Sequence, residues 1–188
     1  MQADKIHLGC GERYKEGWLN VDFPSAEYNP NIKVDLKHNL LKPLPIDSNS
    51  ASFIYNEHVL EHFTMPQGLF ILKECYRVLK KGGVLRVSTP DLEIIVGYYT
   101  DRFREWREDL YVKEGGGDWL QTRCEMVNFR FRDCGHQYIY DTEEITRRFN
   151  EVGFSKIKRV DYAKSDYAAL RNVESREEKS MIMEAIKL

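Results

Sequence analysis

Short apolar runs separated by turn residues fill the first half of the chain. They predict five β-strands, at residues 5–8, 19–23, 32–36, 52–56 and 84–88. Two further runs near the end of the chain, residues 154–160 and 180–186, predict two final strands. The strand at 84–88 is the clearest, because Gly82-Gly83 precedes it and Pro90 follows it.

Two segments have the apolar spacing of a helix instead. The first begins at Thr64 with the spacing of a capping box, and we expect it to run through Lys80 and Lys81 and to end at Gly82-Gly83. The second begins at Asp141 and ends at Gly153. Strands that alternate with helices predict an α/β fold whose mostly parallel sheet is covered on both faces.

Residues 97–133 fit this alternation poorly, since they mix aromatic, arginine and glutamate side chains around Gly115-Gly116-Gly117. We interpret them as an inserted helix and loop within a single domain of residues 1–188. The glycine run is a candidate hinge, so this insertion is expected to act as a lid.

The composition argues against nucleic acid and membrane as binding partners. Hydrophobic residues make up 42% of the chain and charged residues 31%, with a net charge of −2, which is typical of a globular protein without a nucleic-acid partner. The chain has no apolar run long enough to cross a bilayer and no signal-peptide pattern. Four scattered cysteines suggest neither a zinc site nor disulfides, so a cytoplasmic location is expected.

The first candidate ligand-binding residues are Gly9-Cys10-Gly11, directly after the first predicted strand. Glycines in such a turn let the backbone approach a ligand closely. The second strand ends at Asp22, whose carboxylate could accept hydrogen bonds from both hydroxyls of a ribose. A plain tight turn followed by a solvated aspartate is the alternative.

Two features separate this pattern from a dinucleotide site. The third glycine of the dinucleotide fingerprint would stand at Tyr14, and only eleven positions separate Gly11 from Asp22, where about 20 are expected. The pattern therefore favours a nucleoside cofactor without a pyrophosphate over NAD. A nicotinamide-dependent oxidoreductase remains a weaker alternative.

These residues and several later runs together resemble class I S-adenosylmethionine-dependent methyltransferases, in particular the short members often encoded among glycan-assembly genes. The later runs are Gly17-Trp18-Leu19-Asn20-Val21-Asp22, Leu44-Pro45-Ile46-Asp47, His58-Val59-Leu60-Glu61-His62 and Arg77-Val78-Leu79-Lys80-Lys81-Gly82-Gly83. The resemblance implies a Rossmann-like fold with a seven-stranded sheet and an antiparallel last strand. It also implies S-adenosylmethionine as the cofactor.

Carried over by position, the resemblance implies a cofactor site in three parts. Gly9, Cys10 and Gly11 would lie behind the methionine portion and Asp22 would hold the ribose. Asn39 and Leu40 would lie beside the adenine. Asn56, Glu57 and His58 would face the amino-acid end and the reacting methyl group. The chain departs from the family at Arg13, where many members have glycine, and at Asn39, where many have aspartate.

The acceptor is less constrained by the sequence. Asn56-Glu57-His58-Val59 stands where enzymes that methylate exocyclic base amines carry an Asn/Asp-Pro-Pro-aromatic run. An oxygen or nitrogen of a sugar or other small molecule is therefore the expected acceptor. A non-catalytic nucleoside-binding protein with the same fold is an alternative.

Histidines are the candidate catalytic groups. We expect His136 to lie at the wall of the acceptor pocket as a general base, the alternative being a histidine that only hydrogen-bonds its loop. His58 and His62 are four residues apart and could share a helix face, but only Glu61 is near and no third ligand is evident, so no metal is expected.

Overall fold

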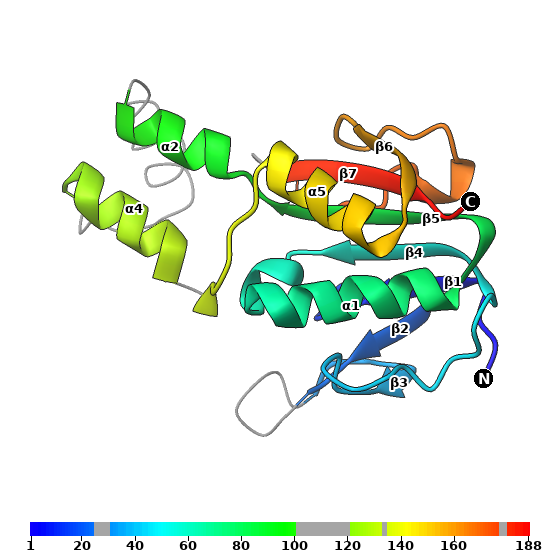
Figure 1. Cartoon of the computed structure of the whole chain (residues 1–188). Helices are drawn as coiled ribbons and strands as arrows, with labels where there is room; N and C mark the ends of the chain where they lie inside the picture. The colour runs from blue at the N-terminus through cyan, green and yellow to red at the C-terminus, as the bar shows by residue number, and fades with distance from the viewer. Residues whose placement is uncertain (25–30, 101–120, 133–134, 177–179) are drawn as a thin grey trace.

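The computed structural model describes residues 1–24, 31–100, 121–132, 135–176 and 180–188. They form a seven-stranded sheet in the order β3-β2-β1-β4-β5-β7-β6 (Figure 1). The strands are β1 (Lys5–Leu8), β2 (Leu19–Asp22), β3 (Leu36–Lys37), β4 (Ala51–Glu57), β5 (Leu79–Pro90), β6 (Ser155–Arg159) and β7 (Ser180–Ile186).

Strands β1 to β5 pair in parallel, whereas β7 lies antiparallel between β5 and β6. The predicted α/β fold, Rossmann-like with an antiparallel last strand, is confirmed. β1 has β2 on one side and β4 on the other, so the strand order reverses there. A crevice at the carboxyl ends of the strands is expected at such a point.

The predicted strand over residues 32–36 is wrong in position, since β3 covers only Leu36–Lys37. Just before β3, side-chain hydrogen bonds replace the regular backbone pairing with β2. The Asp35 carboxylate accepts hydrogen bonds from the backbone and side-chain nitrogens of Asn20, at 2.8 and 2.9 Å. Regular ladder pairing with β2 therefore begins only at Leu36, opposite Val21.

The two predicted helices are α1 (Met65–Val78) and α5 (Thr142–Val152), and both cover the same face of the sheet (Figure 1). The backbone N–H of Thr64 donates to the Gln67 side chain at 2.9 Å, as a capping box requires. At α5, the Asp141 carboxylate accepts from the Glu144 N–H at 2.7 Å, and Gly153 ends the helix with φ +106°.

The end of α1 differs from the prediction. The helix ends at Val78, and Leu79 already begins β5, so Lys80 and Lys81 lie in a strand. Leu79 is fully buried and pairs with Ala51 of β4, which favours extended backbone over another helical turn. Lys80 instead pairs with Asp4 at 2.9 Å on the surface.

Alternation along the strands gives the sheet two different faces. Ile6, Leu8, Ile54, Leu85 and Val87 are buried in the core cluster that includes the apolar residues of α1 and α5. The intervening positions are more polar, namely His7, Tyr55, Arg86 and Glu184. Residues from the 160–176 segment contact these positions, and the 3-10 turn η4 (Ala168–Leu170) within it contacts β4.

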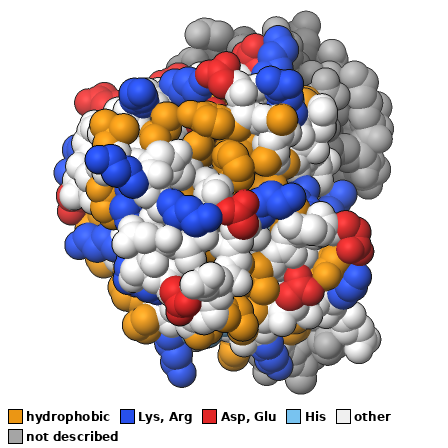
Figure 2. Space-filling model, turned by 90° about the vertical axis from the view of Figure 1, so that its right-hand side faces the viewer, with side chains coloured by type: hydrophobic (Ala, Val, Ile, Leu, Met, Phe, Trp, Pro, Cys, Tyr) orange, Lys and Arg blue, Asp and Glu red, His pale blue; other side chains and the backbone are white. Residues whose placement is uncertain are grey.

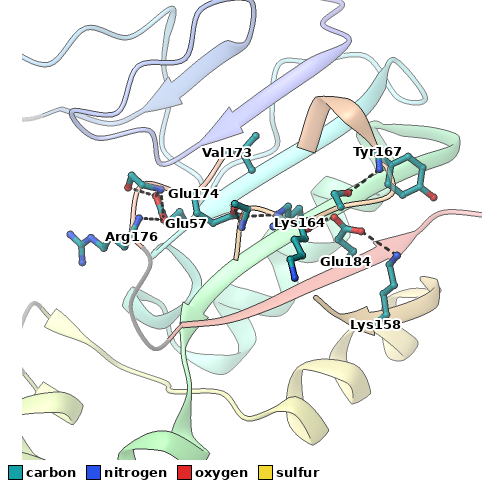
Figure 3. Close-up of polar contacts among 12 residues, drawn as sticks. Glu57, Lys158, Lys164, Tyr167, Val173, Glu174, Arg176 and Glu184 are labelled. Carbon is teal, nitrogen blue, oxygen red and sulfur yellow. Dashed lines mark hydrogen bonds and ion pairs between the residues drawn. The ribbon is translucent and has the colours of Figure 1, made fainter. Parts of the chain in front are cut away.

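A buried arginine fastens that segment to the sheet. The Arg86 guanidinium pairs with Glu174 and with Glu184, the latter at 2.6 Å, and donates to the Lys164 carbonyl at 2.8 Å. Figure 3 shows Glu174, Lys164 and Glu184 in this network. Arg86 and the two carboxylates are buried, so removal of Arg86 would leave two buried carboxylates without their shared cation.

The predicted insertion at residues 97–133 is only partly within the described residues. It includes the end of α2 (Leu92–Thr100) and all of α4 (Arg123–Arg132), which contact each other beyond the carboxyl ends of the strands (Figure 1). Residues 101–120, with the candidate hinge Gly115-Gly116-Gly117, lie outside the described residues, as does Asp133. Among the helices that are described, none has the length and apolar character needed to cross a bilayer.

Charged side chains of both signs are interspersed on the surface that Figure 2 shows, which faces right in Figure 1. Lys and Arg side chains alternate there with Asp and Glu around a group of hydrophobic side chains. This face carries a mixed charge pattern, in keeping with the net charge of −2.

Protonation of His7 is expected to reduce stability at mildly acidic pH. Burial, aided by the charge of Lys15, lowers the pKa of His7 from 6.5 to about 4. The unfolded chain therefore takes up this proton at a higher pH than the folded chain does. The contribution of neutral His7 to the free energy of unfolding should be complete above pH 6.5. It should fall by about 3 kcal/mol between pH 6.5 and pH 4. Urea unfolding at a series of pH values measures this change.

The matched variant is His7→Phe, which cannot titrate. It keeps a ring against Tyr55, since the ring centroids of His7 and Tyr55 lie 5.2 Å apart. It should reduce the fall in stability without abolishing it, because the pKa of His62 is also lowered by burial and acts in the same direction. An equal fall in wild type and variant would contradict this account.

Candidate functional site

A cavity of about 430 Å³ lies at the carboxyl ends of β1, β2 and β4, where the strand order reverses. Its volume is in the range of small-molecule sites. Five of the predicted cofactor residues line it: Gly9, Asp22, Asn39, Leu40 and His58. The other lining residues are Phe23, His38, Val59, His62 and Phe63.

Asp22 is held at the cavity wall by backbone donors. Its carboxylate accepts from the N–H of Gly11 at 2.7 Å and from the N–H of Phe23 at 2.6 Å. A carboxylate offers about four lone-pair sites, so two remain for a ligand. The bonded Gly11 N–H also joins the turn after β1 to the end of β2.

The two glycines of the predicted turn have different surroundings. Both have positive φ, +64° at Gly9 and +48° at Gly11. A Cβ on Gly9 would lie 2.3 Å from Cγ2 of Val59, whereas a Cβ on Gly11 would meet nothing within 4 Å. Gly9 is therefore required by its contact with Val59, and Gly11 is the glycine that leaves space beside Asp22.

The wall beyond β3 combines a short polar turn with apolar side chains. Asn39 Oδ1 accepts from the Leu41 N–H at 2.9 Å, which fixes the amide within its own turn. Phe23, Leu40 and Phe63 supply apolar surface to the same cavity. A flat, largely apolar group with a few polar edges fits such a wall.

Four of the predicted cofactor residues do not line the cavity: Cys10, Gly11, Asn56 and Glu57. The Cys10 side chain is buried, and burial together with the nearby charge of Asp22 raises its thiol pKa to about 12. Asn56 is fully buried in β4. Glu57 accepts hydrogen bonds from the N–H and hydroxyl of Ser175, at 2.9 and 2.5 Å, and from the N–H of Arg176 at 3.2 Å (Figure 3).

The lining residues that the sequence analysis missed are mostly neighbours of predicted ones. Phe23 follows Asp22, His38 precedes Asn39, and Val59 follows His58. A residue beside a strand end reaches the same edge of the sheet, so this adjacency was the available signal. Phe63 gave no such signal, because the turn that places it follows η1 (Leu60–His62).

His58 stands at the β4 end of the cavity in an uncommon backbone conformation, with φ +53°. Its Nδ1 lies 2.9 Å from Glu61 Oε1 and its Nε2 lies 3.0 Å from Ser180 Oγ. Both ring nitrogens are thus engaged. The imidazole is held in place, with one edge at the cavity.

The segment with His136 returns to this edge of the sheet. The Glu61 carbonyl accepts from the N–H of Gln137 at 2.7 Å. The Gln137 side chain in turn donates to the His62 carbonyl at 2.7 Å. The His136 ring lies 5.1 Å from the ring of His62, centroid to centroid, and its Nδ1 lies 2.8 Å from the Arg130 carbonyl oxygen. His136 is therefore next to a residue that lines the cavity.

A second cavity, of about 570 Å³, is lined by residues 158–161, 163–166 and 171. Several of its charged groups already have partners: Lys158 pairs with Asp166, and Lys164 pairs with Asp161 at 3.1 Å. It shares no lining residue with the cavity at Gly9 and Asp22.

Comparison with known proteins gives matches in sequence and in structure. Residues 19–87 match the model of a methyltransferase domain. A probable S-adenosylmethionine-dependent methyltransferase of Mycolicibacterium smegmatis is 42% identical over 100 residues, which are 47% of this chain and 38% of that protein. The match thus spans well under half the length of the relative.

Two solved structures are similar over essentially the whole chain. A possible histamine N-methyltransferase from Thermotoga maritima has a TM-score of 0.59 at 20% identity, covering 100% of this chain and 83% of that one. A S-adenosylmethionine-dependent methyltransferase from Archaeoglobus fulgidus also has a TM-score of 0.59, at 15% identity, covering 99% and 86%.

At these identities the structures establish the fold, and the sequence match adds the methyltransferase domain within it. The resemblance found in the sequence is confirmed: the chain has the fold of class I S-adenosylmethionine-dependent methyltransferases, and its residues 19–87 match a methyltransferase domain.

Proposed function

We propose that the chain is a methyltransferase that binds S-adenosylmethionine in the 430 Å³ cavity and methylates an oxygen or nitrogen of a small-molecule or sugar acceptor. The observation that carries the proposal is the position of Asp22. Its carboxylate lies on the cavity wall at the end of β2, beside the open space at Gly11.

The residues present fit a nucleoside cofactor. The two free lone-pair sites of Asp22 match the two hydroxyls of a ribose. The apolar side chains of Phe23, Leu40 and Phe63 suit an adenine ring, with Asn39 at its edge. Tyr14 stands where the third glycine of a dinucleotide site would be, so a cofactor without a pyrophosphate fits better than NAD.

When bound, S-adenosylmethionine supplies a methyl group already activated by a positively charged sulfur. The protein then has to align the acceptor and exclude water, and it needs a base only where the acceptor must lose a proton. His136, whose ring lies beside that of the cavity-lining His62, is suited to this task, because a neutral imidazole can accept a proton.

Asp22 should be the strongest single polar anchor of the cofactor, so removal of its carboxylate should weaken cofactor binding. Asp22→Ala loses two charge-assisted hydrogen bonds, and we expect a loss of roughly 3 kcal/mol or more, about 100-fold in affinity. Calorimetric titration with S-adenosylmethionine measures the change. Glu16→Ala is the control, because Glu16 pairs with Lys33 on the surface. Equal affinity in folded Asp22→Ala and wild type would refute the placement of the ribose.

The open space at Gly11 provides a steric test. Gly11→Val should fold with a penalty of about 1–2 kcal/mol from its positive φ, and it should block the cofactor. Gly82→Val is the matched control, since Gly82 has φ +81° and open space around it but lies at the amino end of β5. Thermal unfolding should place the two variants close together, while only Gly11→Val loses binding. Normal binding by Gly11→Val would separate the turn from the cofactor site.

Gly9→Val does not serve this purpose, because its side chain would strike Val59 and destabilise the fold before any ligand is involved. A loss of binding in that variant would therefore report on folding.

His136 is the proposed general base. Its Nδ1 is directed to the Arg130 carbonyl, so the neutral ring carries the proton there and Nε2 has a free lone pair. His136→Ala should lower kcat by about 100-fold or more, with cofactor affinity retained. Reduced stability with normal turnover would assign the residue a structural role only. Cofactor binding without transfer to any acceptor in a broad panel would favour a non-catalytic nucleoside-binding protein.

A further inference from the structure

Three side chains from segments far apart in the sequence meet at the edge of the cofactor cavity. Glu61 and His62 belong to η1, and His136 comes from the segment that returns beside it. One ligand atom from each residue lies within 4.8 Å of those from the other two. Two imidazoles and one carboxylate form a common ligand set for a divalent cation.

The outer contacts of this cluster are those of a metal site. His136 is hydrogen-bonded through Nδ1 to the Arg130 carbonyl at 2.8 Å, which leaves Nε2 with its lone pair. The Glu61 carboxylate is oriented by His58 at 2.9 Å and by the Thr89 hydroxyl at 3.2 Å. Histidine and carboxylate ligands of metals are usually fixed by second hydrogen bonds of this kind.

Burial and charge also favour a cation. The Glu61 side chain is fully buried, and its side-chain partners among the described residues, His58 and Thr89, carry no permanent positive charge. A buried carboxylate is costly without compensation.

We propose that Glu61, His62 and His136 bind a divalent first-row transition-metal ion. Imidazole ligands favour Co²⁺ or Zn²⁺ over Mg²⁺ and Mn²⁺, which prefer oxygen. Because His62 also lines the cavity, the remaining coordination positions are available to an acceptor oxygen or nitrogen. The cation would use the Nε2 lone pair of His136, so the ligand role and the proposed base role of this residue are alternatives.

The ligand atoms need only small movements to reach bonding distances. Zn–N and Zn–O bonds are about 2.0–2.2 Å long, so tetrahedral ligand atoms lie about 3.4 Å apart. The ligand atoms lie within 4.8 Å of one another, so any pair has at most about 1.4 Å to close. The proposal does not rest on the proposed function, because cation binding requires neither cofactor nor acceptor.

The test measures metal binding by the whole chain without cofactor. Protein stripped with a chelator is titrated with Zn²⁺, Mn²⁺ and Mg²⁺ by calorimetry, and with Co²⁺ by visible absorption. We expect one Zn²⁺ or Co²⁺ per chain and weaker binding of Mg²⁺. The visible absorption of bound Co²⁺ should be that of an ion with nitrogen ligands. Zn²⁺ should also raise the thermal unfolding midpoint, since it binds the folded state.

The ligand variants are His62→Ala and His136→Ala, and His38→Ala is the matched control, because His38 lines the same cavity outside the cluster. Each ligand variant should weaken Zn²⁺ binding beyond the roughly 10–100-fold typical of losing an outer-shell partner, while His38→Ala should not. If an alanine variant is unfolded before metal is added, the glutamine variant at that position replaces it. Absence of stoichiometric binding by wild type would overturn the proposal. So would ligand variants that bind as wild type does.

Discussion

The close contact between Gly9 and Val59 fixes the position of the candidate site. It joins the end of β1 to the segment that follows β4, across the point where the strand order reverses, and it leaves no room for a Cβ at residue 9. From this point the chain can turn so that the Gly11 N–H reaches the Asp22 carboxylate at 2.7 Å. The cavity, its carboxylate and its histidines depend on that arrangement.

Residues 164–176 pack on the face of the sheet opposite α1 and α5 and hold the strand ends in place. Arg86 holds residues 164 and 174 against the sheet, and Glu57 holds Ser175 and Arg176 at the end of β4. The Glu57 side chain therefore holds the fold together and does not line the cavity, although Glu57 is the last residue of β4. His58, one residue further, turns with positive φ and reaches the cavity.

The elements that depend on local sequence pattern were predicted correctly. Those whose bounds or positions depend on contacts between distant residues were not. The strands, α5 with its Asp141 and Gly153 caps, and the Gly9–Asp22 turn follow from periodicity and from the conformations that single residues allow. The displacement of β3 depends on the Asp35 side chain bonding to Asn20. The early end of α1 depends on the pairing of Leu79 with Ala51. The meeting of His62 and His136 depends on backbone hydrogen bonds between two segments, which no local spacing reveals.

The central claim is that the cavity at the β1–β4 reversal is a nucleoside-cofactor site. A crystal structure of the protein with S-adenosylhomocysteine tests it most directly, because it shows both the occupied cavity and the contacts made there. The account predicts the ribose hydroxyls on the Asp22 carboxylate and the adenine beside Asn39 and Leu40. Binding in the cavity at residues 158–171, or a ribose that does not contact Asp22, would contradict it.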